Sequence, residues 1–202
     1  SQRTRHKLLR AGILPPRLSS WAQLLNYGDT VSFLDVTGFT RHAFMALETA
    51  LLRVHTVPVK GSAPALNFRG QIGLYLFYLG SRMNLKHLCL LFGIFPPTAS
   101  EIILKMMTIV VQGLSDDRHG RVKWPTEVEM EEYAQMVFTR SNSQVANVIA
   151  MVDGLAIPCE CTDDPLVQNA YFNGYYHDTA VNNVFAFSPT GKIIYACINA
   201  RG

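Results

Sequence analysis

Cysteine, charge and long apolar stretches are all scarce in this chain of 202 residues. Its four cysteines are too few for a disulfide-stabilised scaffold, and the N-terminus has no hydrophobic signal segment, so we expect a reducing intracellular environment. No apolar run approaches the roughly 20 residues that cross a bilayer, since Lys105 interrupts even the run from Ile102 to Val111. We therefore expect no integral membrane protein and no membrane partner.

Low-complexity sequence and dense blocks of like charge are also missing. Hydrophobic residues make up 49% of the chain and charged residues 16%, which is enough apolar material for a packed core. This composition excludes disorder for most of the chain. The length suits one ordinary domain or two small ones.

Acidic residues are nearly absent from the start of the chain. Residues 1–69 contain nine Lys or Arg and three Asp or Glu, a net charge of +6, whereas residues 70–202 have a net charge of −3. Five basic residues precede the first acidic one: Arg3, Arg5, Lys7, Arg10 and Arg17. We interpret residues 1–18 as a basic arm that can lie along DNA phosphates. A solubilising tail and an organelle transit peptide are the alternatives.

Residues 19–140 have the periodicity of helices. Phe44, Leu47, Leu51 and Val54 recur at three- and four-residue spacing, which predicts one apolar helix face. Thr126 and Glu129 form a capping box ahead of an acidic helix. The predicted helices cover residues 40–54, 66–79, 85–92, 98–113 and 127–138.

Residues 85–111 resemble a helix-turn-helix, with Gly93 in the turn. Arg82 and Lys86 are placed to touch phosphates, but the second helix offers mainly Ser100 and Lys105 to base edges. An apolar stripe at helical spacing usually belongs to a core. We therefore favour a packed core helix over a DNA-reading one.

Residues 141–202 have the pattern of strands. The unbroken apolar run 148–152 predicts a strand buried on both faces, which Asp153 and Gly154 would end. The β-rich runs 181–187 and 192–199 flank turn residues at 188–191 and predict a hairpin. The expected fold class is α+β, with a helical N-terminal region followed by three antiparallel strands.

Asp153 is the strongest candidate for chemistry. A carboxylate at the end of an apolar strand must be solvated, hydrogen-bonded or bound to a metal, because burying it bare is very costly. The alternative is an Asp that begins a turn with Gly154.

Two other groups of residues carry weaker signals. Cys159, Cys161, His177 and Cys197 could form a zinc site, but the one-residue gap between the first two favours half-buried thiols. The aromatic residues could stack on unpaired bases, although we favour cross-strand packing. They are Tyr171, Phe172, Tyr175 and Tyr176.

The run from Val148 to Pro158 around Asp153 resembles the strand that carries the first catalytic Asp in Harbinger-type DDE transposases. Supporting stretches stand in the family's order: residues 85–111, Lys123-Trp124-Pro125-Thr126, 171–177, 181–184 and 188–194. The resemblance covers about residues 40–202.

That resemblance implies a ribonuclease-H-like fold in which three carboxylates hold two divalent cations, Mg²⁺ or Mn²⁺, for cleavage of DNA phosphodiesters. Asp153 is the first metal-binding and catalytic carboxylate in this scheme. The family's second Asp follows the strand that matches residues 192–199, and this chain has no acid there. We therefore expect residues 141–202 to be the incomplete start of the nuclease domain, inactive as this chain.

The sequence thus suggests a transposase-derived DNA endonuclease of the DDE type. The alternative is a non-catalytic, transposase-derived protein that binds DNA or another protein. The resemblance implies DNA and a Myb-like DNA-binding protein as partners, and a location in the nucleus.

Overall fold

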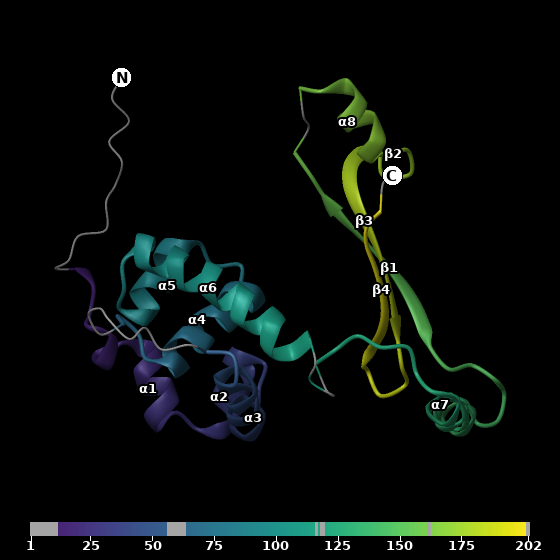
Figure 1. Ribbon diagram of the computed structural model, residues 1–202, viewed down its shortest axis with the longest axis horizontal. Helices are drawn as coiled ribbons and strands as arrows, with labels where there is room; N and C mark the ends of the chain where they lie inside the picture. The colour runs from purple at the N-terminus through teal and green to yellow at the C-terminus, as the bar shows by residue number, and fades with distance from the viewer. Residues whose placement is uncertain (1–11, 56–63, 116, 118–119, 161–162, 201–202) are drawn as a thin grey trace. The chain divides into compact units, whose positions relative to one another are not determined.

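A computed structural model of the chain describes residues 12–55, 64–115, 117, 120–160 and 163–200 (Figure 1). The chain divides into two compact units, residues 1–121 and 122–202. The first contains helices and the second a small antiparallel sheet with two helices. The α+β class is therefore confirmed.

The described residues of the first unit form a 3₁₀ helix, η2 (Pro16–Leu18), and six α-helices. The predicted helices over residues 40–54, 66–79, 85–92 and 98–113 are all present, with small shifts at their ends. The six helices are α1 (Ser20–Tyr27), α2 (Thr30–Thr37), α3 (Arg41–Leu52), α4 (Phe68–Gly80), α5 (Leu85–Phe92) and α6 (Pro96–Ser115).

Helix α4 is the central element of this unit and packs against α1, α2, α5 and α6. Its residues from Gly70 to Tyr75 are all buried, which covers more than one full turn and is typical of a helix enclosed by others. Trp21 of α1 lies against it, so closely that a Cβ on Gly73 would stand 2.3 Å from the indole ring. Phe92 stacks on Trp21 with a centroid distance of 5.3 Å, and Phe33, Phe44 and Phe77 surround the pair.

The second unit begins with α7 (Glu127–Arg140). The predicted capping box is confirmed, since Thr126 Oγ1 accepts the Glu129 amide and the Glu129 carboxylate accepts the Thr126 amide. The hydrogen bonds that the Thr126 amide and then its hydroxyl donate to the Glu129 carboxylate hold the pKa of Glu129 below its usual value. Helix α7 belongs to the same compact unit as the sheet. The sequence analysis instead placed the boundary at residue 140, which assigned α7 to the helical region.

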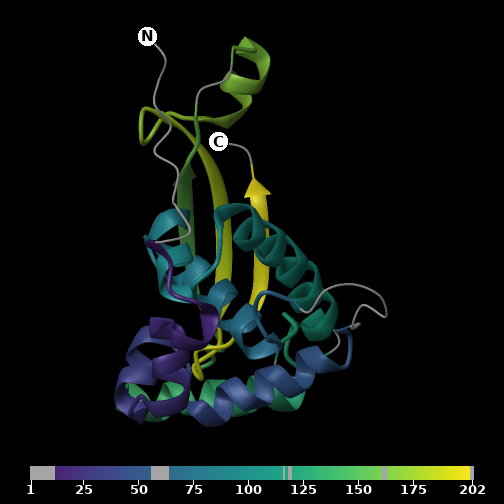
Figure 2. The same ribbon diagram turned by 90° about the vertical axis from the view of Figure 1, so that its left-hand side faces the viewer.

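The sheet contains β1 (Met151–Pro158), β2 (Phe172–Asn173), β3 (Asp178–Phe187) and β4 (Ile193–Ala200). Strand β3 is central: β1 pairs antiparallel along one side of it and β4 along the other (Figure 2). Short β2 pairs with the beginning of β3. Two short elements were not predicted. Strand β2 pairs over only two residues, which is too short for a sequence pattern. Helix α8 (Pro165–Tyr171) begins after Asp164 within a region that we predicted to be strand.

The predicted hairpin is confirmed. Ser188 and Lys192 close the turn between β3 and β4, with the Ser188 amide donating to the Lys192 carbonyl oxygen at 2.8 Å. Gly191 has a φ of 83°, the left-handed conformation that glycine adopts without strain.

Among the described residues, no single helix is long and apolar enough to span a membrane. Helices α5 and α6 satisfy length and composition only when taken together, and they are bent by 94° at their junction.

Candidate functional site

Asp153 is the third residue of β1, and this corrects the prediction that it ends a buried strand. It lies opposite Phe185 of β3, and β1 continues to Pro158. Its Oδ1 accepts a hydrogen bond from the Gly154 amide at 2.8 Å, so Asp-Gly continues the strand here and begins no turn. The Asp153 side chain is exposed.

The strand around Asp153 is exposed on both faces, contrary to the prediction. Met151, Val152 and Leu155 are 63%, 69% and 51% exposed. The physical reason is that β1 packs substantially only against β3 among the described residues, and β3 pairs beside it in the plane of the sheet without covering either face. An unbroken apolar run indicates burial only when both faces of the sheet are covered.

The other acidic residues after Asp153 lie beyond the far end of β1. Glu160 and Asp163 follow that strand, and Asp164 caps α8 by accepting the Leu166 amide at 2.9 Å. Asp178 begins β3, seven residues from the partner of Asp153, which is roughly 20 Å along a strand. Two metal ligands cannot share an ion over that distance.

The described residues therefore do not fit a two-metal site. They contain no group of three or more His, Cys, Asp or Glu side chains that could hold a metal ion. Asp153 supplies one carboxylate, and two dications require more anionic ligands than this. No step of phosphodiester cleavage is assigned to the described residues.

The predicted DNA-contacting residues all belong to the first unit. Arg3, Arg5, Lys7 and Arg10 lie outside the described residues. Arg17 is exposed in η2; Arg82 precedes α5 and Lys86 lies in its first turn, and both are exposed. The structure thus brings Arg82 and Lys86 to the same end of α5.

Helices α5 and α6 have the angle and the short turn of a helix-turn-helix. The turn consists of Gly93, Ile94 and Phe95, and Gly93 has a φ of 70°. The preferred interpretation of α6 as a core helix is confirmed, because one side of it is buried and made of Ala99, Ile102, Ile103, Met106 and Ile109.

The outer side of α6 is poor in groups that read bases. Ser100, Glu101 and Lys105 are exposed there, but Leu104 and Val111 are exposed as well, at 65% and 64%. Specific base contacts need Arg, Asn or Gln at several positions of such a helix. The helix-turn-helix geometry is present here without that chemistry.

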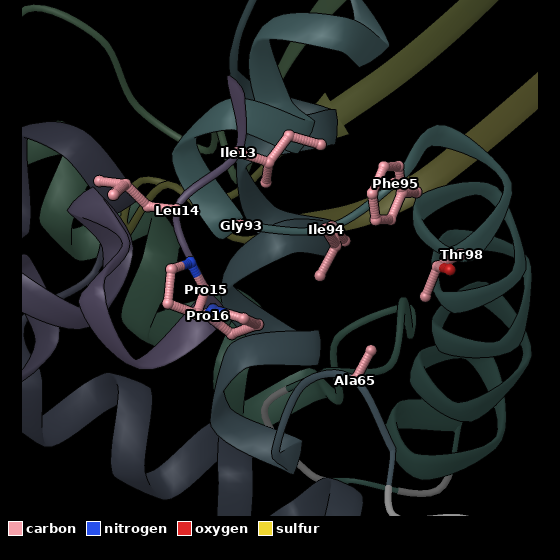
Figure 3. A pocket seen from close by; sticks show the side chains of 9 residues that line it. All are labelled: Ile13, Leu14, Pro15, Pro16, Ala65, Gly93, Ile94, Phe95 and Thr98. Atoms are coloured by element: carbon pink, nitrogen blue, oxygen red, sulfur yellow. The ribbon is translucent and has the colours of Figure 1, made fainter. Parts of the chain in front are cut away.

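An apolar pocket of about 420 Å³ lies beside the turn (Figure 3). The extended segment from Ile13 to Pro16 forms one wall, and Gly93, Ile94 and Phe95 form another. A Cβ on Gly93 would stand 2.4 Å from the Leu14 carbonyl oxygen, so this contact requires glycine. Pro96 and Pro97 have no amide hydrogen, which removes the donors that bind phosphate at other helix N-termini.

The structure also gives the positions of most of the cysteines and aromatic residues that the sequence analysis singled out. Cys159 is half-buried, Cys197 is exposed on β4, and Cys161 lies outside the described residues. The preferred cross-strand packing of the aromatic residues is wrong for Tyr175 and Tyr176. These are 86% and 57% exposed in the turn after β2, where their rings contact each other at 5.1 Å.

The turn formed by Asn173 and Gly174 explains why Tyr175 and Tyr176 are exposed. The Asn-Gly pair was the sequence signal that could have predicted it. Asn173 Oδ1 accepts the Tyr175 amide at 2.9 Å, which is the side-chain turn that Asn before Gly favours. Reading Asn-Gly as a turn would have placed the two tyrosines outside the ladder.

Compared with known proteins, the chain matches no family model, no curated protein and no solved structure.

Proposed function

We propose that the chain is a transposase-derived protein of the DDE endonuclease type, in which Asp153 is one of the carboxylates that bind Mg²⁺ or Mn²⁺. The observation that carries this proposal is the position of Asp153. It is an exposed carboxylate within β1, the edge strand of an antiparallel β1-β3-β4 sheet. The proposal includes the finer assignment of this sheet as the beginning of a ribonuclease-H-like domain.

Three features support the proposal. The three longer strands are antiparallel neighbours, as the resemblance implies for the first three strands of that fold. The outer edge of β1 has no partner among the described residues, so further strands with further carboxylates can add beside Asp153. The Gly154 amide orients the Asp153 carboxylate through Oδ1.

The division of charge supports DNA as a partner of the first unit. Residues 1–121 contain fourteen Lys or Arg and six Asp or Glu, a net +8, whereas residues 122–202 contain four and nine, a net −5. Phosphates attract the first and repel the second. We propose that the helical unit holds DNA in the nucleus, with a Myb-like protein as a further partner.

Manganese broadening of NMR signals tests the role of Asp153. Mn²⁺ broadens the signals of amides near its site, so we expect selective loss of Gly154 and Phe185 signals in the wild-type chain. Asp153→Asn removes a carboxylate ligand and abolishes this loss, while the control Glu132→Gln on exposed α7 keeps it. Equal broadening in wild type and Asp153→Asn would refute the ligand role.

A plasmid-nicking assay with Mg²⁺ or Mn²⁺ tests whether this chain cleaves DNA. We expect no nicking, because one carboxylate does not hold two cations in line with a phosphate. Nicking that Asp153→Asn abolishes would instead show that further ligands complete the site around Asp153. The assignment of an incomplete site would then be wrong.

The second candidate function is a non-catalytic protein that binds DNA or another protein, and the lack of a metal-ligand group among the described residues favours it. Salt-titrated duplex binding tests the DNA part. Replacing Arg3, Arg5, Lys7 and Arg10 with Gln should flatten the logarithmic salt slope by up to about 0.9 for each phosphate that is no longer neutralised. We use substitutions rather than a truncation because the neighbouring segment from Ile13 to Pro16 packs beside Gly93, and deleting it would disturb the fold.

The matched control is Lys123→Gln in the acidic second unit, which should leave the slope unchanged. Binding that is insensitive to salt, or equally affected by the control, would count against the basic arm as the DNA-binding segment.

A further inference from the structure

Helix α8 and β2 precede β3 in the chain (Figure 1), and this segment has several exposed apolar and aromatic side chains. Tyr175 and Leu166 are 86% and 81% exposed, Tyr176 is 57%, and Phe172 and Val167 are 45% and 44%. We name these five side chains the aromatic tip. Single exposed apolar residues are ordinary, but a group of this kind within a short segment marks an interaction surface.

Local hydrogen bonds hold the backbone of the aromatic tip in place. Asn173 Oδ1 accepts the amides of Tyr175 and Tyr176 at 2.9 and 3.3 Å, and Asn173 Nδ2 donates to Asn182 Oδ1 of β3 at 3.4 Å. Asp164 caps α8, which packs against β3. A partner therefore meets side chains on an ordered backbone, which lowers the entropy cost of binding.

The sequence that contains the aromatic tip is acidic. Residues 141–191 contain five Asp or Glu and no Lys or Arg. Four of the acids flank the tip in sequence: Glu160, Asp163, Asp164 and Asp178.

Charge and aromatic surface together decide between possible occupants. Nucleic acid can stack on tyrosine, but its phosphates are repelled by these carboxylates. A guanidinium group satisfies both features, because it stacks on an aromatic face and pairs with carboxylates in a planar geometry. We propose that the aromatic tip binds an arginine-containing basic segment of a partner protein. This proposal uses none of the residues around Asp153.

The test measures the affinity of the full chain for labelled short peptides in which arginine or lysine alternates with glycine. We expect the arginine peptide to bind more tightly, and Tyr175→Ala combined with Tyr176→Ala to weaken it roughly tenfold. Both tyrosines are exposed, so the double variant should keep the fold, which circular dichroism verifies. The control is Tyr27→Ala on α1, where a tyrosine is similarly exposed, at 80%, and the affinity should not change.

A second pair of variants tests the charge. Glu160→Gln with Asp163→Asn should weaken the arginine peptide and reduce its salt dependence, whereas Glu131→Gln with Glu132→Gln on α7 should not. Equal peptide affinity in wild type and the tyrosine variant would overturn the proposal. So would equal binding of the lysine peptide, or binding of oligothymidine that the tyrosine variant abolishes, since that would identify a nucleic-acid surface.

Discussion

Trp21 in the helical unit is enclosed by four phenylalanines, whereas the large side chains of β1 in the sheet unit are half exposed or more. Of the buried hydrophobic residues in the described part of the chain, only Ala180, Ala186 and Ile194 belong to the sheet unit. Helices can surround a central helix on every side. A small sheet has two faces and needs other layers to cover them.

The comparison indicates where each unit derives its stability. The helical unit buries large aromatic surfaces, and at about 25 cal/mol per Å² this burial dominates its folding energy. The sheet unit depends on ladder hydrogen bonds, the hairpin and the capped helices α7 and α8. The two units also differ in net charge, which is +8 for the helical unit and −5 for the sheet unit.

Hydrogen exchange should show the largest difference between the units. We expect the amides of α4 to exchange on the order of 1000-fold more slowly than the β1 amides that pair with β3, because α4 opens only when the core does. Amide exchange followed by NMR measures this directly. Equal protection of Leu74 and Leu155 would show that the sheet is covered in solution.

The second prediction breaks the helical unit alone. Gly73→Ala places a methyl group against the Trp21 ring and should lower the free energy of unfolding by up to about 3 kcal/mol. Urea unfolding followed by helical circular dichroism measures the change. Gly80→Ala on the same helix has open space at its Cβ and should be neutral or slightly stabilising. A similar loss in both variants would contradict the close approach of Trp21.

The third prediction concerns Arg41, which ties α3 to the end of α1. Its guanidinium donates to the carbonyl oxygens of Leu24, Leu25 and Gly28 and lies 4.5 Å from the centre of the Phe33 ring. Arg41→Met should cost about 2 kcal/mol of stability in the same assay, because the charge-assisted hydrogen bonds to these carbonyls are removed.

The control for Arg41 is Arg53→Met, at the exposed end of α3. Its cost should stay within about 0.5 kcal/mol, as for most surface substitutions. Equal costs for the two variants would show that the carbonyl hydrogen bonds contribute nothing specific.

The smallest effect is expected at the start of α7. The Thr126 amide and then its hydroxyl hold the pKa of Glu129 below its ordinary value of 4.5. A lowered folded pKa means that this stabilisation is complete above about pH 4.5 and is lost as pH falls through the folded value. NMR titration of the Glu129 side chain should show the pKa rising part of the way toward 4.5 in Thr126→Ala, which removes the hydroxyl donor and keeps the amide. Thr139→Ala, at the other end of α7, should leave the pKa of Glu129 unchanged, and no difference between the two variants would remove the Thr126 hydroxyl as a cause.

Helices α3 to α7 were predictable because local sequence rules agree with the tertiary structure there. Phe44 and Leu51 recur at helical spacing and are buried as that spacing predicts. Thr126 and Glu129 form a cap from four neighbouring residues, and the turn residues 188–191 form the hairpin. In each case the residues that determine the structure are close together in the sequence.

The surroundings of Asp153 were predicted less well. Sequence alone placed Asp153 at the end of a buried strand over residues 148–152, whereas β1 runs from Met151 to Pro158 and is largely exposed. Burial of a strand depends on which other elements cover it, and those elements are distant in sequence. The distance from Asp153 to Asp178 likewise follows from the pairing of β1 with β3.

By itself, therefore, the sequence determined helices α3 to α7, the cap of α7, the β3–β4 hairpin and the uneven distribution of charge, since each depends on residue type and short spacing. The tertiary structure alone decided that Trp21 joins four phenylalanines from different helices and that β1 is an edge strand. These features depend on contacts between residues far apart in the chain, which local propensity does not encode.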